Sequence, residues 1–152
     1  TTGVRHQMTS LRFRSALLVA FLATAVVAAG CGGNDDQPGL SVPFQIIDLV
    51  VGTGPEVDNG NAVLVAYTGW LYDLSAVENK GMQFDQSSEA GFSFIVGAGQ
   101  VIAGWDAGVR GMRVGGQRRL IIPPGLGYGS GGQGSIPPDS ALVFDIELLE
   151  IL

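Results

Sequence analysis

Few side chains of this 152-residue sequence could support covalent or metal chemistry, since it contains one histidine, His6, and one cysteine, Cys31. A single cysteine cannot form an internal disulfide, and one cysteine with one histidine cannot complete a zinc site. A domain that begins after His6 has no histidine for a Ser-His-Asp triad, a Cys-His pair or general base catalysis near neutral pH. An enzyme built from this domain must work with carboxylates, tyrosines, backbone groups or non-covalent binding.

Glycine is the second unusual feature, because its 24 copies make up about 16% of the chain against an ordinary ~7%. Residues 127–132 read GYGSGG and fit the G-x-G-x-x-G pattern of phosphate-binding loops. That pattern needs a helix whose N-terminus faces the phosphate, whereas Pro137 and Pro138 follow here and prevent such a helix from starting in the right place. We interpret the run as a turn-rich flap and not as a nucleotide site.

The elements that must position the remaining chemistry are mostly short β-strands. Hydrophobic residues make up 46% of the chain, which is enough for a core. Strands are predicted over residues 43–51, 61–72, 92–96, 117–122 and 142–148. The last shows the best alternation, with Leu142, Phe144, Ile146 and Leu148 facing in and Asp145 and Glu147 facing out. Short strands separated by Gly and Pro predict a mainly antiparallel sheet, and residues 73–81 are expected to form a surface loop.

One segment departs from this β pattern. Within residues 101–109, Ile102, Trp105 and Val109 recur at helical spacing on one face. A helix this short is not stable alone in water, so it must lie against the sheet with Trp105 at the contact. Plain core packing would explain Trp105 equally well.

The first thirty residues have the features of a secretory signal peptide. Arg12 and Arg14 follow Met8, and residues 15–30 read SALLVAFLATAVVAAG without a charge. A basic start, an apolar stretch and small residues before a cleavage site are typical of such a signal, and the run is shorter than the ~20 residues of a membrane span. Met8 is a candidate start of translation, which would place residues 1–7 before it. An uncleaved anchor helix and a buried core helix are the alternatives.

Cys31 closes this segment in the sequence Ala-Ala-Gly-Cys, which resembles the lipobox of bacterial lipoproteins. Lipidation would make Cys31 the mature N-terminus and leave residues 31–42 as a flexible tether, with GGNDDQPG directly after the cysteine. We therefore expect an exported protein, periplasmic or on the cell surface, that is anchored to a membrane by lipid. A plain secreted protein with an incidental cysteine is the alternative.

Cleavage would change the charge of the chain. Residues 1–30 contain Arg5, Arg12 and Arg14 but no acidic residue, so eight basic residues less three leave five against fourteen acidic ones. The net charge then falls from −6 to −9. Such an acidic domain lacks the positive surface that binds a phosphate backbone, so nucleic acid is not an expected partner.

Residues 43–152 resemble the FKBP-type peptidyl-prolyl isomerases over nearly the whole length of the domain. The motifs are YTG at residues 67–69, FD at 84–85, GAGQVIAGWD at 97–106, GVRGM at 108–112, YG at 128–129, IPP at 136–138 and LVFDIELL at 142–149. Each motif is weak by itself, but their common order is specific. The resemblance implies an α+β fold in which a twisted antiparallel β-sheet wraps around one short α-helix.

The resemblance also implies a substrate pocket between sheet and helix. Carried over by motif, the catalytic residues would be Tyr67, Phe84, Asp85, Tyr128 and Phe144, and the substrate-binding residues Phe92, Val101, Ile102, Trp105 and Ile136. Trp105 would form the floor beneath the proline ring. The Ile102 backbone N–H and the Tyr128 hydroxyl would hold the peptide, or a macrolide inhibitor such as tacrolimus or rapamycin. We expect no metal or cofactor, and a monomer that acts on proline-containing polypeptides.

Three departures from the family pattern stand out. The loop after Asp85, residues 86–91, is short and lacks the arginine that often pairs with the aspartate. Gln100 stands where some members have an acid, and the flap at residues 130–135 is short. The altered surroundings of Asp85 keep open a non-catalytic module that binds or chaperones proline-containing segments. A structural lipoprotein is a further alternative, against which the complete set of aromatic residues argues.

Overall fold

The computed structural model describes residues 41–152. The predicted signal peptide, the lipidation site Cys31 and nearly all of the tether lie outside these residues. The described part forms six strands, β1 (Gln45–Val50), β2 (Ala62–Tyr72), β3 (Lys80–Gln86), β4 (Phe92–Ile95), β5 (Gln117–Ile122) and β6 (Leu142–Ile151), and one α-helix, α1 (Ala103–Val109). Three short 3-10 helices accompany them, η1 (Val77–Asn79), η2 (Pro124–Leu126) and η3 (Gly129–Gly131).

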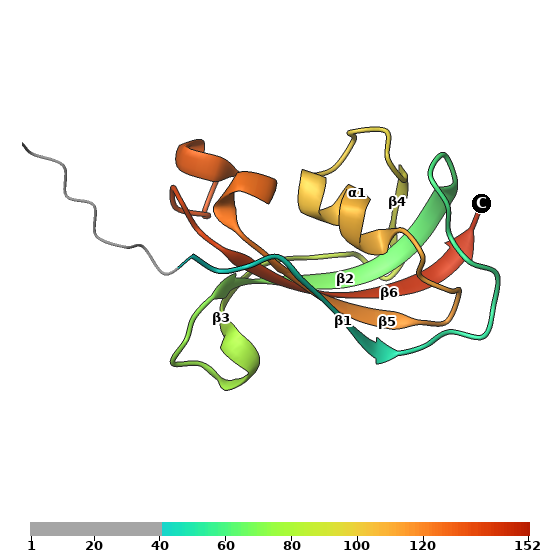
Figure 1. Cartoon of the computed structure of the whole chain (residues 1–152), viewed down its shortest axis with the longest axis horizontal. Coiled ribbons are helices and arrows are strands. Elements are labelled where there is room, and N and C mark those ends of the chain that lie inside the picture. Colours follow the sequence, from blue (N-terminus) through green and yellow to red (C-terminus); the bar gives the residue numbers. More distant parts are fainter. Residues whose placement is uncertain (1–40) are drawn as a thin grey trace, which may run out of the picture. The chain divides into compact units, whose positions relative to one another are not determined.

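The strands form one antiparallel sheet in the order β1-β5-β6-β2-β3, and β4 also pairs with β2. On one edge, residues 62–65 of β2 pair with β4 and residues 68–72 pair with β3. On the other edge, β2 runs along β6. Figure 1 shows α1 lying across one face of this twisted sheet. The fold class predicted from the sequence is therefore confirmed.

The alternation predicted for β6 determines which side of the sheet faces the helix. Leu142, Phe144, Ile146 and Leu148 are all buried in the core, whereas Asp145 and Glu147 are partly exposed on the opposite side. Val63 and Val65 of β2 are likewise buried. The side chains of the core come mainly from the face of the sheet that α1 covers.

Two glycines allow α1 to approach this face closely. A Cβ atom on Gly104 would lie 2.6 Å from a methyl carbon of Ile122, and one on Gly108 would lie 2.5 Å from a methyl carbon of Leu120. The two glycines are four residues apart, so they share the side of α1 that contacts β5. This close packing brings Trp105 beneath the sheet. Within residues 41–152, no helix is long and apolar enough to cross a membrane.

The opposite face of the sheet carries a network of four charged side chains. Asp145 of β6 accepts hydrogen bonds from Arg119 of β5 at 2.7 and 2.9 Å, and its Oδ2 lies 2.7 Å from Lys80 Nζ. Glu78 contacts both Lys80, at 2.9 Å, and Arg119, at 3.2 Å. Burial opposes the ionisation of Asp145, but the bonds from Arg119 and Lys80 outweigh it and hold the pKa of Asp145 below its ordinary value.

The segment predicted as a surface loop, residues 73–81, ends earlier than expected. Lys80 and Gly81 already belong to β3, and Val77–Asn79 form η1. Glu78 and Asn79 have φ angles of 56° and 58°, in a region that residues other than glycine seldom adopt. The ion pairs of Glu78 connect this turn to Lys80 of β3 and Arg119 of β5.

Candidate active site

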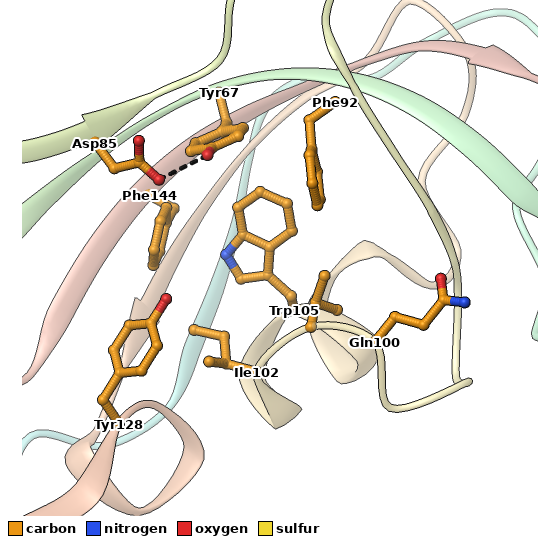
Figure 2. Close-up of a pocket in the computed structure, with 9 residues that line it drawn as sticks. Tyr67, Asp85, Phe92, Gln100, Ile102, Trp105, Tyr128 and Phe144 are labelled. Atoms are coloured by element: carbon orange, nitrogen blue, oxygen red, sulfur yellow. Dashed lines mark hydrogen bonds between the residues drawn. The ribbon is translucent and has the colours of Figure 1, made fainter. Parts of the chain in front are cut away.

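A cavity of about 440 Å³ lies between α1 and the face of the sheet that it covers. Figure 2 shows its side chains converging from β2, β4, β6, α1 and the loops beside them. The lining residues are Tyr67, Asp85, Phe92, Gln100, Val101, Ile102, Trp105, Tyr128 and Phe144. Asp85 is the one charged residue among these nine, so the cavity is an aromatic and aliphatic pocket with a single carboxylate at its wall.

Trp105 forms the base of this aromatic arrangement. Its ring meets Tyr67 and Phe144 edge to face, with centroids 4.9 and 5.2 Å apart, and Phe92 stands edge-on at 6.1 Å. The indole is 4% exposed, and its Nε1 has no hydrogen-bond acceptor within residues 41–152. Since the plane of Trp105 is perpendicular to three neighbouring rings, those rings wall a space above it that suits a small apolar ring.

Tyr67 and Asp85 form the polar wall of the pocket. The Tyr67 hydroxyl donates a 2.7 Å hydrogen bond to Asp85 Oδ2, drawn as a dashed line in Figure 2. The Gln86 backbone N–H donates to Asp85 Oδ1 at 2.8 Å. Burial, together with the bond to the carboxylate, raises the pKa of Tyr67 well above its ordinary value, so this hydroxyl is a donor at neutral pH. The Tyr67 hydroxyl and the Gln86 N–H therefore orient the Asp85 carboxylate, although the loop after it contains no arginine.

Two further donors belong to the predicted site. Figure 2 shows the Tyr128 hydroxyl pointing into the cavity from the loop before η3, and no hydrogen bond to it is found within residues 41–152. Burial, and then the charge of Asp85, raise the pKa of Tyr128, so its hydroxyl keeps its proton. Ile102 precedes α1, and its carbonyl accepts bonds from Trp105 and Asp106. Its own N–H makes no hydrogen bond in the described part of the chain.

The turn that leads into α1 is held by side chains of the GAGQVIAGWD motif. Asp106 Oδ1 and Oδ2 accept hydrogen bonds from the backbone N–H groups of Gly97 and Gly99, each at 2.9 Å. Gly97 and Gly99 have φ angles of 79° and 68°, which favour glycine. Gln100 follows, lines the pocket, and accepts a 2.9 Å bond from the Ile95 N–H. Sequence reasoning noticed Gln100 as a substitution but did not place it in the site.

The structure brings together eight of the ten residues predicted for the pocket, namely Tyr67, Asp85, Phe92, Val101, Ile102, Trp105, Tyr128 and Phe144. Phe84 and Ile136 are not part of the lining. Phe84 stands edge-on against Phe144, with ring centroids 5.5 Å apart, and so supports the wall from behind. Ile136 is 6% exposed and belongs to the hydrophobic core. Both side chains pack in or against the hydrophobic core instead.

Gly69 provides the room that the rings of Phe84 and Phe144 need. It pairs with Phe144 on one edge of β2 and with Asp85 on the other. A Cβ atom at Gly69 would lie 2.7 Å from the Phe144 ring and 2.9 Å from the Phe84 ring. The last residue of the YTG motif is therefore small because two aromatic rings occupy the space over it.

The arrangement can bind and desolvate a small ring, and it can donate hydrogen bonds to a ligand from its edges. Within residues 41–152 no group of three or more His, Cys, Asp or Glu side chains is placed to hold a metal ion. The described part of the chain thus combines one antiparallel sheet, one short α-helix and an aromatic pocket between them.

The comparisons with known proteins agree with this architecture. The family description "FKBP-type peptidyl-prolyl cis-trans isomerase" matches residues 54–149. FK506-binding protein 4 of Dictyostelium discoideum is 48% identical over 107 residues, which cover 70% of this chain and 28% of that protein. Peptidyl-prolyl cis-trans isomerase FKBP15-3 of Arabidopsis thaliana is 48% identical over 99 residues, covering 64% of this chain and 65% of that protein.

The structure is also similar to a solved one. The crystal structure of a peptidyl-prolyl cis-trans isomerase from Pseudomonas syringae pv. tomato matches with a TM-score of 0.60 and 37% identity, over 71% of this chain and 74% of that one. The chain belongs to the FKBP-type peptidyl-prolyl cis-trans isomerase family. It spans about a quarter of the length of the Dictyostelium relative and about two thirds of the Arabidopsis one.

Proposed function

We propose that this chain is a peptidyl-prolyl cis-trans isomerase that accelerates rotation about X-Pro bonds in unfolded or flexible polypeptides. The observation that carries the proposal is the pocket itself, in which Trp105 lies beneath the edges of Tyr67, Phe92 and Phe144. Membership of the isomerase family supports it. A proline ring is small and apolar, and a floor of one indole with aromatic walls fits it.

The reaction needs none of the residues that the chain lacks. The peptide C–N bond has partial double-bond character and rotates over a barrier of ~18–20 kcal/mol. At X-Pro bonds both isomers are populated and exchange over roughly 10–100 s. The twisted transition state has lost amide resonance and carries less charge separation than the planar amide. An apolar pocket therefore binds it better, relative to the planar form, than water does, which is differential binding in the sense that catalysis requires.

The polar groups at the edges of the pocket serve to hold and orient the peptide. The Tyr128 hydroxyl and the Ile102 N–H, which have no acceptor in the described part of the chain, would donate to carbonyl oxygens on either side of the proline. Tyr67 and Asp85 are tied to each other, so they form a fixed polar edge near the rotating carbonyl. The rings of Tyr67 and Phe144 line the same pocket, and their edges, which carry partial positive charge, would contact the rotating carbonyl.

The same pocket would bind macrolides that present a proline-like ring. Several relatives are named FK506-binding proteins, which supports tacrolimus, the compound FK506, and rapamycin as inhibitors of this chain. The contacts would be those of the substrate, with the macrolide ring over Trp105.

We further propose that the domain works outside the cytoplasm, where it assists protein folding from a lipid anchor on Cys31. The support is the sequence of residues 1–42, in which a basic start and an apolar stretch lead to Cys31 and a polar tether. Mass spectrometry of the N-terminus of the protein purified from its native host tests this. A chain that begins at a lipid-modified Cys31 is expected, and a chain that retains residues 15–30 would overturn the proposal.

The isomerase proposal is tested by proline-limited refolding of a test protein with and without the purified full chain. We expect micromolar chain to accelerate the slow phase, tacrolimus to abolish the acceleration, and Asp85→Ala to reduce it. Glu150→Gln, an exposed change near the end of β6, is the matched control and should behave as wild type. No acceleration with tacrolimus binding retained would instead favour a non-catalytic binding module.

A further inference from the structure

We infer that Ser87 is a positioning residue that fixes Tyr67 in the pocket through the backbone of that tyrosine. The inference rests on the proposed isomerase function and deepens it. Ser87 lies in the loop between β3 and β4, outside the cavity lining, and its side chain is half-buried. Four hydrogen bonds from three consecutive residues carry the argument.

The first observation is a gap in the strand pairing beside Tyr67. Along one edge of β2, pairing with β3 ends at Thr68 opposite Gln86, and pairing with β4 begins at Val65 opposite Phe92. Continued by one residue, the β3 register would place Ser87 opposite Tyr67. The chain instead turns away there, and Gly91 with a φ of 80° brings it back to β4. On this edge of β2, the backbone of Tyr67 therefore has no regular strand partner.

Ser87 closes this gap with one bond from its backbone and one from its side chain. Its N–H donates to the Tyr67 carbonyl at 3.0 Å, and its Oγ accepts from the Tyr67 N–H at 3.1 Å. In a hydrogen-bonded pair of a regular antiparallel ladder, the two facing residues exchange both N–H···O=C bonds. Here the serine hydroxyl takes the place of the serine carbonyl in the second bond. An alanine would keep the first bond and leave the Tyr67 N–H without its acceptor.

The two preceding residues hold the other end of the same tyrosine. The Tyr67 hydroxyl donates to Asp85 Oδ2 at 2.7 Å, as Figure 2 shows, and Asp85 Oδ1 accepts from the Gln86 N–H at 2.8 Å. Residues 85–87, which we name the Tyr67 bracket, thus bind Tyr67 at its backbone and at its hydroxyl. The short loop after Asp85 has no arginine that could pair with the aspartate. Asp85 bonds to the Tyr67 hydroxyl instead, and Ser87 bonds to the Tyr67 backbone.

The position of Tyr67 determines much of the pocket wall. Its ring lies 4.9 Å from Trp105, 6.0 Å from Phe92 and 6.2 Å from Phe144, measured between ring centroids. A shift of the Tyr67 backbone therefore moves both the polar edge and the aromatic wall. Misplacement of about 1 Å in a catalytic site can cost about 100-fold in rate. Ser87 affects the reaction through this tyrosine without touching the substrate.

The test uses the full chain and five variants. Ser87→Ala removes the acceptor for the Tyr67 N–H, and Ser87→Thr retains a hydroxyl and should rescue. Ser88→Ala removes the neighbouring exposed hydroxyl, for which no hydrogen bond is found within residues 41–152, and is the matched control. Tyr67→Phe and its combination with Ser87→Ala complete a double-mutant cycle. The measurements are kcat and KM on a proline peptide and hydrogen exchange of the Tyr67 amide.

We expect Ser87→Ala to lower kcat roughly tenfold with a smaller change in KM, and to speed exchange of the Tyr67 amide roughly three- to tenfold. Ser87→Thr and Ser88→Ala should match wild type in both. In the cycle, Ser87→Ala should cost less in the Tyr67→Phe background than in wild type, since both act through one side chain.

Unchanged exchange of the Tyr67 amide in Ser87→Ala would overturn the inference. It would also be overturned if the effects of Ser87→Ala and Tyr67→Phe on kcat simply multiplied in the double variant. A wild-type chain without isomerase activity would overturn the proposed function instead. The exchange measurement needs no activity, so it still decides whether Ser87 sets the position of Tyr67. The two failures are therefore distinguishable.

Discussion

Adjacent residues of β6 belong to two faces of the sheet with opposite chemistry. Phe144 points toward α1, is 3% exposed and meets the rings of Trp105, Phe84 and Tyr67. Asp145 points the other way and is paired with Arg119 and Lys80. On that side of the sheet, which we call the network face, the four charged side chains pair with one another; they are Glu78, Lys80, Arg119 and Asp145. On the pocket face Trp105 Nε1, the Tyr128 hydroxyl and the Ile102 N–H have no acceptor within residues 41–152.

The paired charges of the network face support the fold, whereas the unpaired donors of the pocket face are free to bind a ligand. Buried or half-buried polar groups in a folded protein are normally paired, so the two donors beside the cavity that are unpaired in the described part of the chain, the Tyr128 hydroxyl and the Ile102 N–H, need an explanation. A bound peptide, rich in carbonyl oxygens, would provide it. The network face, in contrast, joins η1, β3, β5 and β6 and requires no ligand. Four substitutions, two on each face, test this difference between the pocket face and the network face.

The largest effect is expected from Phe144→Ala. Removing this buried ring leaves a cavity between sheet and helix, and Phe→Ala changes in cores cost about 3–5 kcal/mol. The free energy of unfolding, measured by urea denaturation, should fall by that amount. Phe92→Ala is the matched change, because Phe92 lines the same pocket but is 39% exposed, and it should cost clearly less. Equal losses of stability in the two variants would contradict the expectation that the more buried ring contributes more to the free energy of unfolding.

Gly69→Ala should have the next largest effect. Alanine is favoured over glycine in a strand by roughly 0.5–1 kcal/mol, but the added Cβ must displace the rings of Phe84 and Phe144, and overpacking costs about 1–3 kcal/mol. We expect a net loss of about 1 kcal/mol in the free energy of unfolding and a reduced rate of proline isomerisation. Gly125→Ala, where a Cβ would meet nothing within 4 Å, is the control. A variant of full stability and activity would show that the two rings move without cost.

Asp145→Asn probes the network face through its pH dependence. Hydrogen bonds from Arg119 and Lys80 hold the folded pKa of Asp145 below its ordinary 3.8. The contribution of the carboxylate is therefore complete above that value and is lost as the pH falls through the folded pKa. At neutral pH the variant should be less stable by up to about 1 kcal/mol, since the network is partly solvated.

The difference between wild type and Asp145→Asn should shrink toward zero as the pH is lowered to about 2. Urea denaturation at several pH values measures it, with Glu150→Gln as the control that should show no such trend. Isomerase activity at neutral pH should be unchanged in Asp145→Asn, because the side chain lies on the face away from the pocket. A difference that grew in acid would contradict the assigned pairing.

The smallest effect is expected from Glu78→Gln. Its carboxylate contacts Lys80 and Arg119, and the bond from Lys80 lowers its pKa, but the side chain is 52% exposed and both cations keep Asp145 as a partner. The midpoint of urea denaturation should move within experimental error at neutral pH. A large drop would mean that the turn at residues 78–79, with its two positive φ angles, depends on this single charge.

Much of the fold followed from local patterns. The alternation of β6, the helical spacing of Trp105 and Val109, and the strand at residues 117–122 depend on periodicity that burial imposes, and the structure confirms them. β3 was not among the predicted strands, and Lys80 at its start pairs with Glu78 and Asp145, residues that are two and sixty-five positions away. The ends of an edge strand depend on such distant contacts more than on local preference.

Eight of the residues predicted from the order of motifs line one cavity, while their roles in catalysis and substrate binding stay predictions. Phe84 and Ile136 were predicted to line the pocket, but they are not among its lining residues. A sequence can place a side chain on the inner face, but which of two neighbouring rings covers the other depends on packing. Gln100 could have been added, since it directly precedes Val101 in the motif that leads into the helix.

The sequence by itself determined the pattern of inward and outward residues, the aromatic set and the absence of a histidine from residues 7–152, because these are local or compositional properties. The tertiary structure alone decided that Ser87 would complete the pairing of Tyr67 and that four charges would meet on the outer face. Apart from the local pair of Lys80 with Glu78, those contacts join residues twenty to sixty-five positions apart. They exist because the register of the strands brings the atoms together, and register is a property of the whole sheet.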